Sequence, residues 1–108
     1  MVLEYKIGQL ESLLDPKKTM EDTFYAVLED IGALKYNYYD YMTTEPINVA
    51  EELKRLPDAD YDLCCALITM LLREDHFCNR SFGKRLKNGE VHPIVEKMVS
   101  ILKESPEA

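Results

Sequence analysis

Six consecutive residues, 73 to 78, bring together an arginine, two acids, a histidine and a cysteine. Such groups can serve as general acid or base, as a thiol nucleophile or as a clamp on an anion. On a helix, side chains meet when they are three or four residues apart, so His76 lies beside Arg73 rather than against Cys78. The spacing therefore builds no cysteine–histidine pair. It assigns no catalytic residue and favours a protein that is not an enzyme.

Arg73 directly follows an apolar run, where a guanidinium needs carboxylate or carbonyl partners. One interpretation is a structural salt bridge to an acid in the N-terminal half of the chain. The alternative is a site for an anionic ligand or an enzyme's substrate, with a phosphate or carboxylate as the bound group. The residues of this candidate site are Arg73, Glu74, His76 and Arg80, with Cys78 beside them.

A second group of charges is basic, and consists of Arg80, Lys84, Arg85 and Lys87 with no acid between them. On a helix most of these side chains share one face, which is usually only solvated. The same face could dock an acidic partner protein or a nucleic-acid backbone. The net charge of −7 argues against a general attraction to nucleic acid. We therefore keep Lys84, Arg85 and Lys87 as candidate residues for binding a protein partner.

Four tyrosines lie within six residues, at positions Tyr36, Tyr38, Tyr39 and Tyr41. They cannot all face one core, so we expect at least one or two of them to be exposed. Exposed tyrosine is typical of protein interfaces, and the four side chains predict a surface for a protein partner or a homodimer. The alternative is that their rings cover the edge of the core with the hydroxyls in water.

The three cysteines cannot all pair, and Cys64 and Cys65 are neighbours whose side chains point about 100° apart on a helix. A reducing cytoplasm fits this usage best. Neither a Cys-x-x-Cys nor a His-x-x-x-His spacing is present, so we predict no metal and no cofactor. The apolar run from 63 to 72 is far shorter than the roughly 20 residues that span a bilayer. We predict a cytoplasmic protein that is neither secreted nor inserted in a membrane.

Helices must position these side chains, because apolar residues recur at intervals of three and four along the chain. The longest apolar stretch predicts a central helix from about 60 to 76, capped by Asp58 or Asp60 and surrounded by the others. Whether the helix that begins near residue 20 stops at Gly32 or continues stays open. The other expected helices cover about 2 to 14, 20 to 34, 46 to 56, 79 to 87 and 93 to 103. The stretch from 36 to 42 could form either two further helical turns, which we favour, or a short extended piece.

Several helix ends have local signals in the sequence. The stretch from Thr19 to Asp22 resembles a capping box. Pro46 can serve as an early residue of the helix that Pro57 closes, and Asn88-Gly89 ends the helix before it. We therefore predict an all-α protein, a single compact domain over residues 1 to 108 with five or six helices.

The second half of the chain resembles a family of small prokaryotic proteins, catalogued as domain of unknown function 6508. The similar positions lie between residues 59 and 102 and consist of Ala59-Asp60, Leu63, Ala66, Thr69, Arg73, Phe77-Cys78, Gly89 and Leu102. The chain departs from the family pattern at His76 and Arg80. The resemblance implies a helical architecture and no established activity. Together with the residues, it favours an interaction or regulatory module over the ligand-binding or enzymatic alternative.

Overall fold

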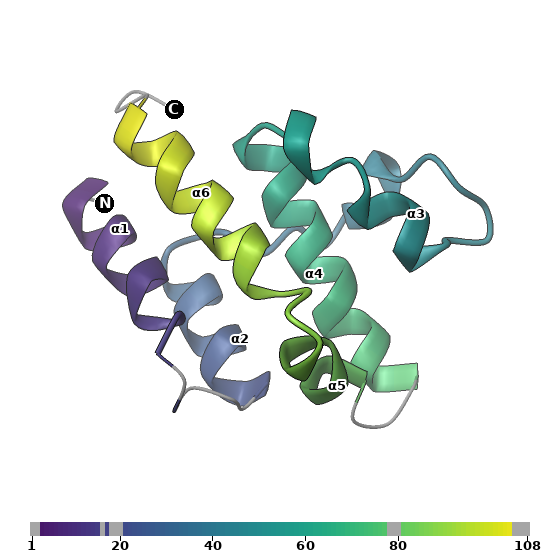
Figure 1. Ribbon diagram of the computed structural model, residues 1–108, viewed down its shortest axis with the longest axis horizontal. Coiled ribbons are helices and arrows are strands. Elements are labelled where there is room, and N and C mark those ends of the chain that lie inside the picture. Colours follow the sequence, from purple (N-terminus) through teal and green to yellow (C-terminus); the bar gives the residue numbers. More distant parts are fainter. Residues whose placement is uncertain (1–2, 16, 18–20, 78–80, 105–108) are drawn as a thin grey trace.

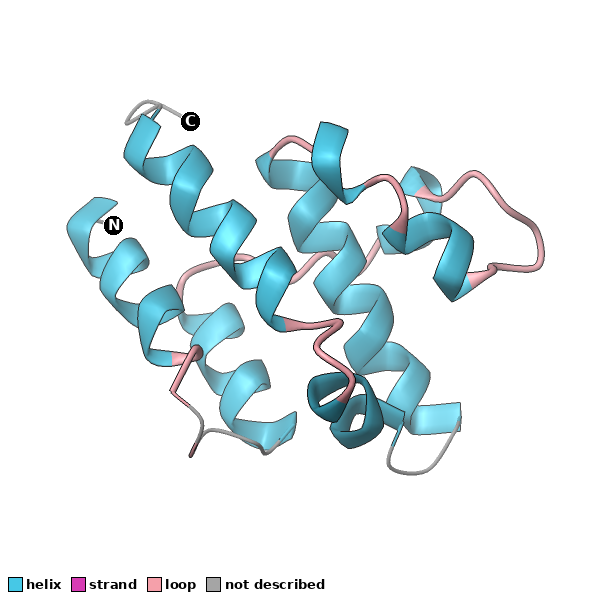
Figure 2. Cartoon of the chain, viewed as in Figure 1, coloured by secondary structure: helices cyan, strands magenta, loops and turns pink. Residues whose placement is uncertain are grey.

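The computed structural model describes residues 3–15, 17, 21–77 and 81–104, and within these ranges the chain is helical with no strand (Figures 1 and 2). The prediction of an all-α protein with five or six helices is confirmed. None of the described helices combines the length and the apolar content that crossing a bilayer requires. The elements are α1 (Leu3–Ser12), α2 (Glu21–Asp30), the 3-10 turn η1 (Tyr38–Tyr41), α3 (Val49–Leu53), the 3-10 turn η2 (Leu56–Asp58), α4 (Tyr61–Phe77), α5 (Ser81–Lys87) and α6 (His92–Glu104).

Helix α4 is the predicted central helix. Asp60 caps it, because its Oδ1 accepts the backbone N–H of Leu63 at 2.8 Å. Every residue from 64 to 72 is buried, and α6, α5, α3 and η1 pack around the helix. Each buried Leu, Ile or Met there stabilises the fold by about 1.5 to 3 kcal/mol. An apolar surface on all sides thus forces the other helices to enclose α4.

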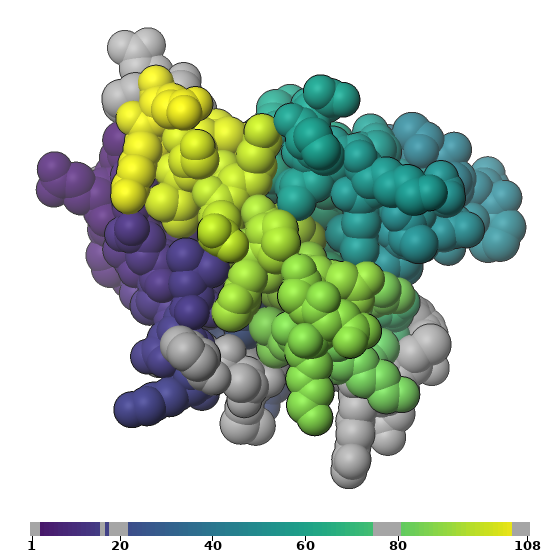
Figure 3. Space-filling model, in the orientation of Figure 1, coloured from purple at the N-terminus to yellow at the C-terminus, as the bar shows by residue number. Residues whose placement is uncertain are grey.

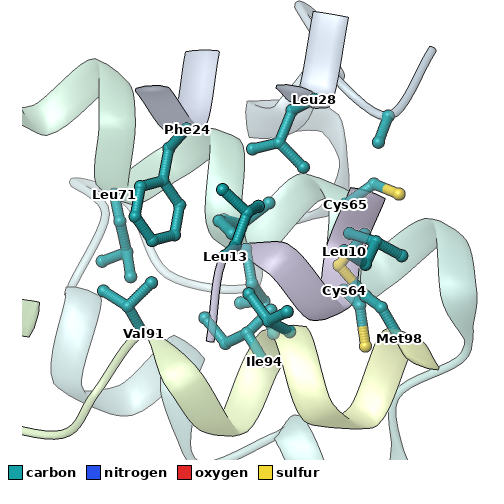
Figure 4. Packing of buried hydrophobic residues seen from close by; sticks show 14 of the residues in the cluster. Leu10, Leu13, Phe24, Leu28, Cys64, Cys65, Leu71, Val91, Ile94 and Met98 are labelled. Carbon is teal, nitrogen blue, oxygen red and sulfur yellow. The ribbon is translucent and has the colours of Figure 1, made fainter. Parts of the chain in front are cut away.

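The hydrophobic core joins α4 to helices from both ends of the chain (Figure 4). Helices α1 and α6 lie side by side, so the first and last elements close one side of the core (Figure 1). On α2 and α5, the rings of Phe24 and Phe82 meet edge to face with centroids 5.0 Å apart. The apolar periodicity of the sequence therefore corresponds to one connected cluster.

Two glycines end helices by the same backbone motif. After α2, Gly32 has a φ of 69°, and the N–H of Ala33 donates to the carbonyl of Leu28 at 2.8 Å. After α5, Gly89 has a φ of 74°, and the N–H of Glu90 donates to the carbonyl of Arg85 at 3.0 Å. The question that the sequence left open at Gly32 is decided, since the left-handed residue stops the helix. The predicted end at Asn88-Gly89 is confirmed.

The predictions between 36 and 57 need correction. The tyrosine stretch forms one 3-10 turn rather than two α-helical turns. The next helix does not begin at Pro46, which follows a cis peptide bond, but at Val49, where the Oδ1 of Asn48 accepts from the N–H of Glu51 at 3.1 Å. It ends at Leu53, and Pro57 lies within η2. The helix begins later than predicted because the backbone amides of Thr43 and Thr44, before α3, donate to the buried carboxylate of Glu52. The predicted capping box at Thr19 lies outside the described residues.

Candidate functional site

The charged end of α4 contains a half-buried ion pair. The guanidinium of Arg85 on α5 donates from Nε to Oε1 and from Nη2 to Oε2 of Glu74, both at 2.9 Å. Its Nη1 also donates to Oε1 of Glu90 at 3.0 Å. These hydrogen bonds to Glu74 are the main reason that the pKa of Arg85 is raised. The network ties the end of α4 to α5 and to the turn before α6.

This network accounts for one member of the predicted anion site. Glu74 faces Arg85, while Arg73 is half-buried and forms no ion pair with a described residue. The predicted salt bridge from Arg73 to an N-terminal acid is therefore not seen within the described ranges. The side chains of His76, Cys78 and Arg80 lie outside them. The anion site of Arg73, Glu74, His76 and Arg80 stays a prediction.

The predicted basic face is divided by the same network. Lys84 and Lys87 are exposed on α5, whereas the Arg85 charge is compensated by Glu74 and Glu90. The sequence suggested an unbroken basic stretch because both acids lie outside it along the chain. In the described part of this face, two lysines remain directed to solvent.

The tyrosine stretch presents two of its four rings to solvent. Tyr36 is 67% exposed and Tyr39 is 62% exposed, more than any other large hydrophobic side chain among the described residues. Tyr38 packs against the core and meets the Tyr39 ring edge to face at 5.8 Å. Tyr41 is half-buried, with the ammonium of Lys35 at 6.0 Å from its ring centroid. The expectation that at least one or two tyrosines are exposed is confirmed.

Two buried polar side chains hold this stretch at its two ends, and they are the two that the described core contains. At the first end, the N–H of Lys35 donates to Oγ1 of Thr69 at 3.0 Å, and that hydroxyl donates to the Cys65 carbonyl at 2.7 Å. At the second end, Glu52 receives the amides of Thr43 and Thr44 at 2.9 and 2.8 Å. The exposed rings are thus carried by a segment that is anchored on both sides.

The Glu52 carboxylate is fully buried on α3 and has several donors. The hydroxyl of Thr44 also donates to it, as does Nη1 of Arg55 at 2.9 Å. The same Arg55 nitrogen donates to the Tyr41 carbonyl at 2.7 Å. Burial by itself would raise the pKa of Glu52, but the hydrogen bonds from Thr44, Arg55 and Thr43 outweigh it and lower the pKa to about 2.

A concavity of about 410 Å³ lies next to the exposed Tyr39 ring, and Tyr39 and residues 42–47 line it. Its apolar wall consists of Met42, Pro46 and Ile47, and its exposed acid is Glu45. The segment between η1 and α3 protrudes at the end of the molecule opposite α1 (Figures 1 and 3). We call Tyr36, Tyr39 and this concavity the tyrosine surface.

Sequence reasoning missed Glu52. A signal was present, since Glu52 stands three residues after Val49 and four before Leu56, on the apolar side of its predicted helix. An acid at such a position needs a buried partner, and Arg55 follows three residues later. The donors from Thr43 and Thr44 could not have been found in this way.

The remaining hollows of the described residues are more open to solvent. Three concavities of about 380, 490 and 300 Å³ lie beside α6, of which the first two share Glu96 and the last two share Pro93. Cys64 and Cys65 are buried in the core, and burial raises the pKa of their thiols to about 11 and about 12. No group of three His, Cys, Asp or Glu side chains within the described ranges is placed to hold a metal ion.

Residues 13–104 match the sequence profile of DUF6508, which is described as a family of unknown function. The match extends well to the N-terminal side of the resemblance at residues 59 to 102. It includes α2, the tyrosine stretch and α3 as well as the central helix. No curated protein and no solved structure matches the chain.

Proposed function

This chain belongs to the DUF6508 family, and we propose that it is a protein-interaction module that binds a partner protein through the tyrosine surface. The observation that carries the proposal is the position of the two polar side chains that are buried in the described core. Thr69 and Glu52 hold the two ends of the segment that exposes Tyr36 and Tyr39. Buried polar groups cost free energy unless they are fully hydrogen-bonded. Here both groups are hydrogen-bonded, and their hydrogen bonds order a surface segment.

The composition of the surface supports the same proposal. Tyrosine offers a large contact area with only two side-chain torsions to immobilise, and it is enriched among the residues that dominate binding energies. A segment that is already ordered loses less conformational entropy when a partner binds. The adjoining concavity, walled by Met42, Pro46 and Ile47, could accept an apolar side chain of that partner.

A cross-linking experiment tests the proposal. Benzoylphenylalanine is placed at position 39 of the intact chain and, as a matched control, at position 5. Tyr5 is also an exposed tyrosine, at 46%, but it lies on α1 at the other end of the molecule, where its hydroxyl donates to Asp30. We expect a defined protein to cross-link from position 39 and not from position 5.

The cross-linked protein is then purified and its affinity measured. It should bind the Tyr36→Ala/Tyr39→Ala double variant at least tenfold more weakly than the parent chain, and it should bind Tyr5→Ala as tightly as the parent chain. Circular dichroism and thermal unfolding of the variants confirm that they are folded. Equal affinity for the parent chain and the double variant would overturn the proposal.

A further inference from the structure

The charges around the tyrosine surface indicate what kind of partner it fits. Residues 35 to 62 contain seven acidic and three basic side chains. Each of the three bases is already paired within the chain. Lys35 pairs with Asp62 at 3.4 Å, Lys54 with Glu51 at 2.9 Å and Arg55 with Glu52 at 2.9 Å.

The other acids of this stretch, all of which the structure describes, pair with none of these three bases. Two of them are the acids of the stretch that lie closest to Tyr36 and Tyr39 along the sequence. Asp40 and Glu45 are exposed, and neither forms an ion pair with a described residue. Asp40 directly follows Tyr39 on η1, and Glu45 lines the concavity beside Tyr39. The tyrosine surface therefore combines an aromatic face with carboxylates whose charge the described part of the chain does not compensate.

The chain already contains one such arrangement with its own cation. The ammonium of Lys35 lies 6.0 Å from the Tyr41 ring centroid and 3.4 Å from the Asp62 carboxylate. An aromatic face attracts a cation through its quadrupole, and a nearby carboxylate adds a charge-assisted contact. Tyr39 with Asp40 and Glu45 offers these two kinds of group to a cation from outside.

Resting on the proposed function, we infer that the tyrosine surface binds a cationic segment of its partner protein, in which lysine or arginine lies against Tyr39 and an apolar residue enters the concavity. A second copy of this chain fits less well, because an isologous dimer brings the same patch of both copies together. Asp40 and Glu45 would then approach their own copies, and like charges oppose association. The overall charge of −7 also steers a cationic partner toward this chain.

A library of displayed 12-residue peptides, with all amino acids at equal frequency, tests this inference on the intact protein. We expect the enriched peptides to have a net positive charge and at least one large apolar residue. The best peptide should bind Asp40→Asn/Glu45→Gln at least tenfold more weakly than the parent chain, and its affinity should fall severalfold between 50 and 300 mM salt. The matched control Asp22→Asn/Glu29→Gln removes two exposed charges from α2 and should leave the affinity unchanged.

The other outcomes separate the two proposals. Neutral or acidic peptides that lose affinity with Tyr39→Ala would overturn the cationic partner but leave the proposed function standing. Enriched peptides that are insensitive to Tyr39→Ala, or no enriched peptides at all, would contradict both. A concentration-dependent dimer in analytical ultracentrifugation that Tyr39→Ala abolishes would identify a second copy as the occupant and would also overturn the inference.

Discussion

The side chain of Thr44 and its own backbone amide both donate to the buried carboxylate of Glu52, which lies eight residues later in the chain. The Thr44 hydroxyl in turn accepts the N–H of Asn48 at 2.8 Å. One carboxylate thus organises the loop before α3 and, through Asn48, the start of the helix that carries it. Hydrogen bonds to a buried charge therefore fix the loop that carries the concavity.

We expect Glu52→Gln to lower the free energy of unfolding by about 1 to 3 kcal/mol, because charge-assisted hydrogen bonds to a buried group are replaced by weaker ones and Arg55 loses its counter-charge. Chemical denaturation of both proteins measures the change. The control is Glu51→Gln, since that neighbouring acid is exposed and should cost less than about 0.5 kcal/mol. Equal effects at the two positions would show that Glu52 is not an anchor.

The pH dependence of stability should carry the signature of Glu52. Its pKa falls from an ordinary value near 4.5 to about 2 on folding, so its ionised form stabilises the folded state. This contribution is complete above pH 4.5 and is lost as the pH falls toward 2. The stability difference between the parent chain and Glu52→Gln should therefore shrink across this window. A difference that stays constant from pH 6 to pH 2 would contradict the lowered pKa.

Replacing Gly32 by alanine should destabilise the fold by about 1 kcal/mol, because a side chain disfavours the left-handed backbone that ends α2. Apart from the adjoining residues, no atom lies within 4 Å of the added Cβ, so the cost is that of the backbone alone. The control is Gly83→Ala, in the exposed middle of α5 and equally open, which should stabilise the helix by up to about 1 kcal/mol. The thermal unfolding midpoint should fall in Gly32→Ala and rise in Gly83→Ala, each relative to the parent chain.

A double-mutant cycle on Glu74 and Arg85 should give a coupling free energy of about 1 to 3 kcal/mol, because the pair is bidentate and half-buried. The comparison pair is Glu51 on α3 and Lys54, the residue that follows the helix. It forms one exposed contact and should couple by less than about 0.5 kcal/mol. All variants are alanine substitutions, and stability is measured by denaturant unfolding. A coupling no larger than that of the exposed pair would remove the structural role of the network.

The thiols of Cys64 and Cys65 should be unreactive in the folded protein. Burial raises the pKa of both, and the thiolate is the form that attacks a disulfide reagent. In a Cys78→Ser variant, which leaves only these two cysteines, we expect reaction with an aromatic disulfide at pH 8 to be at least tenfold slower than in denaturant. Reaction at the rate of the unfolded chain would show that the core around them is open.

Local patterns in the chain predicted most of the helices. The apolar run from Leu63 to Leu72 requires a helix that is covered on all sides, and Asp60 and Gly89 mark helix ends by chemistry that acts within a few residues. Between residues 36 and 57 the same kind of reasoning failed. Pro46 is compatible with a helix start, but the amides of Thr43 and Thr44 donate to Glu52. The helix propensities of these residues do not predict such hydrogen bonds.

The candidate site, too, could be predicted from the sequence only in part. The sequence by itself determined that some of the four tyrosines must be exposed, since adjacent side chains cannot all reach one core. Only the tertiary structure decided that the exposed ones are Tyr36 and Tyr39. It also decided that the Arg85 guanidinium pairs with Glu74 instead of pointing to solvent. The physical reason is the distance along the chain over which each interaction acts. Helix periodicity and capping depend on residues within about one turn, whereas buried polar side chains are satisfied by whichever donors the fold brings to them.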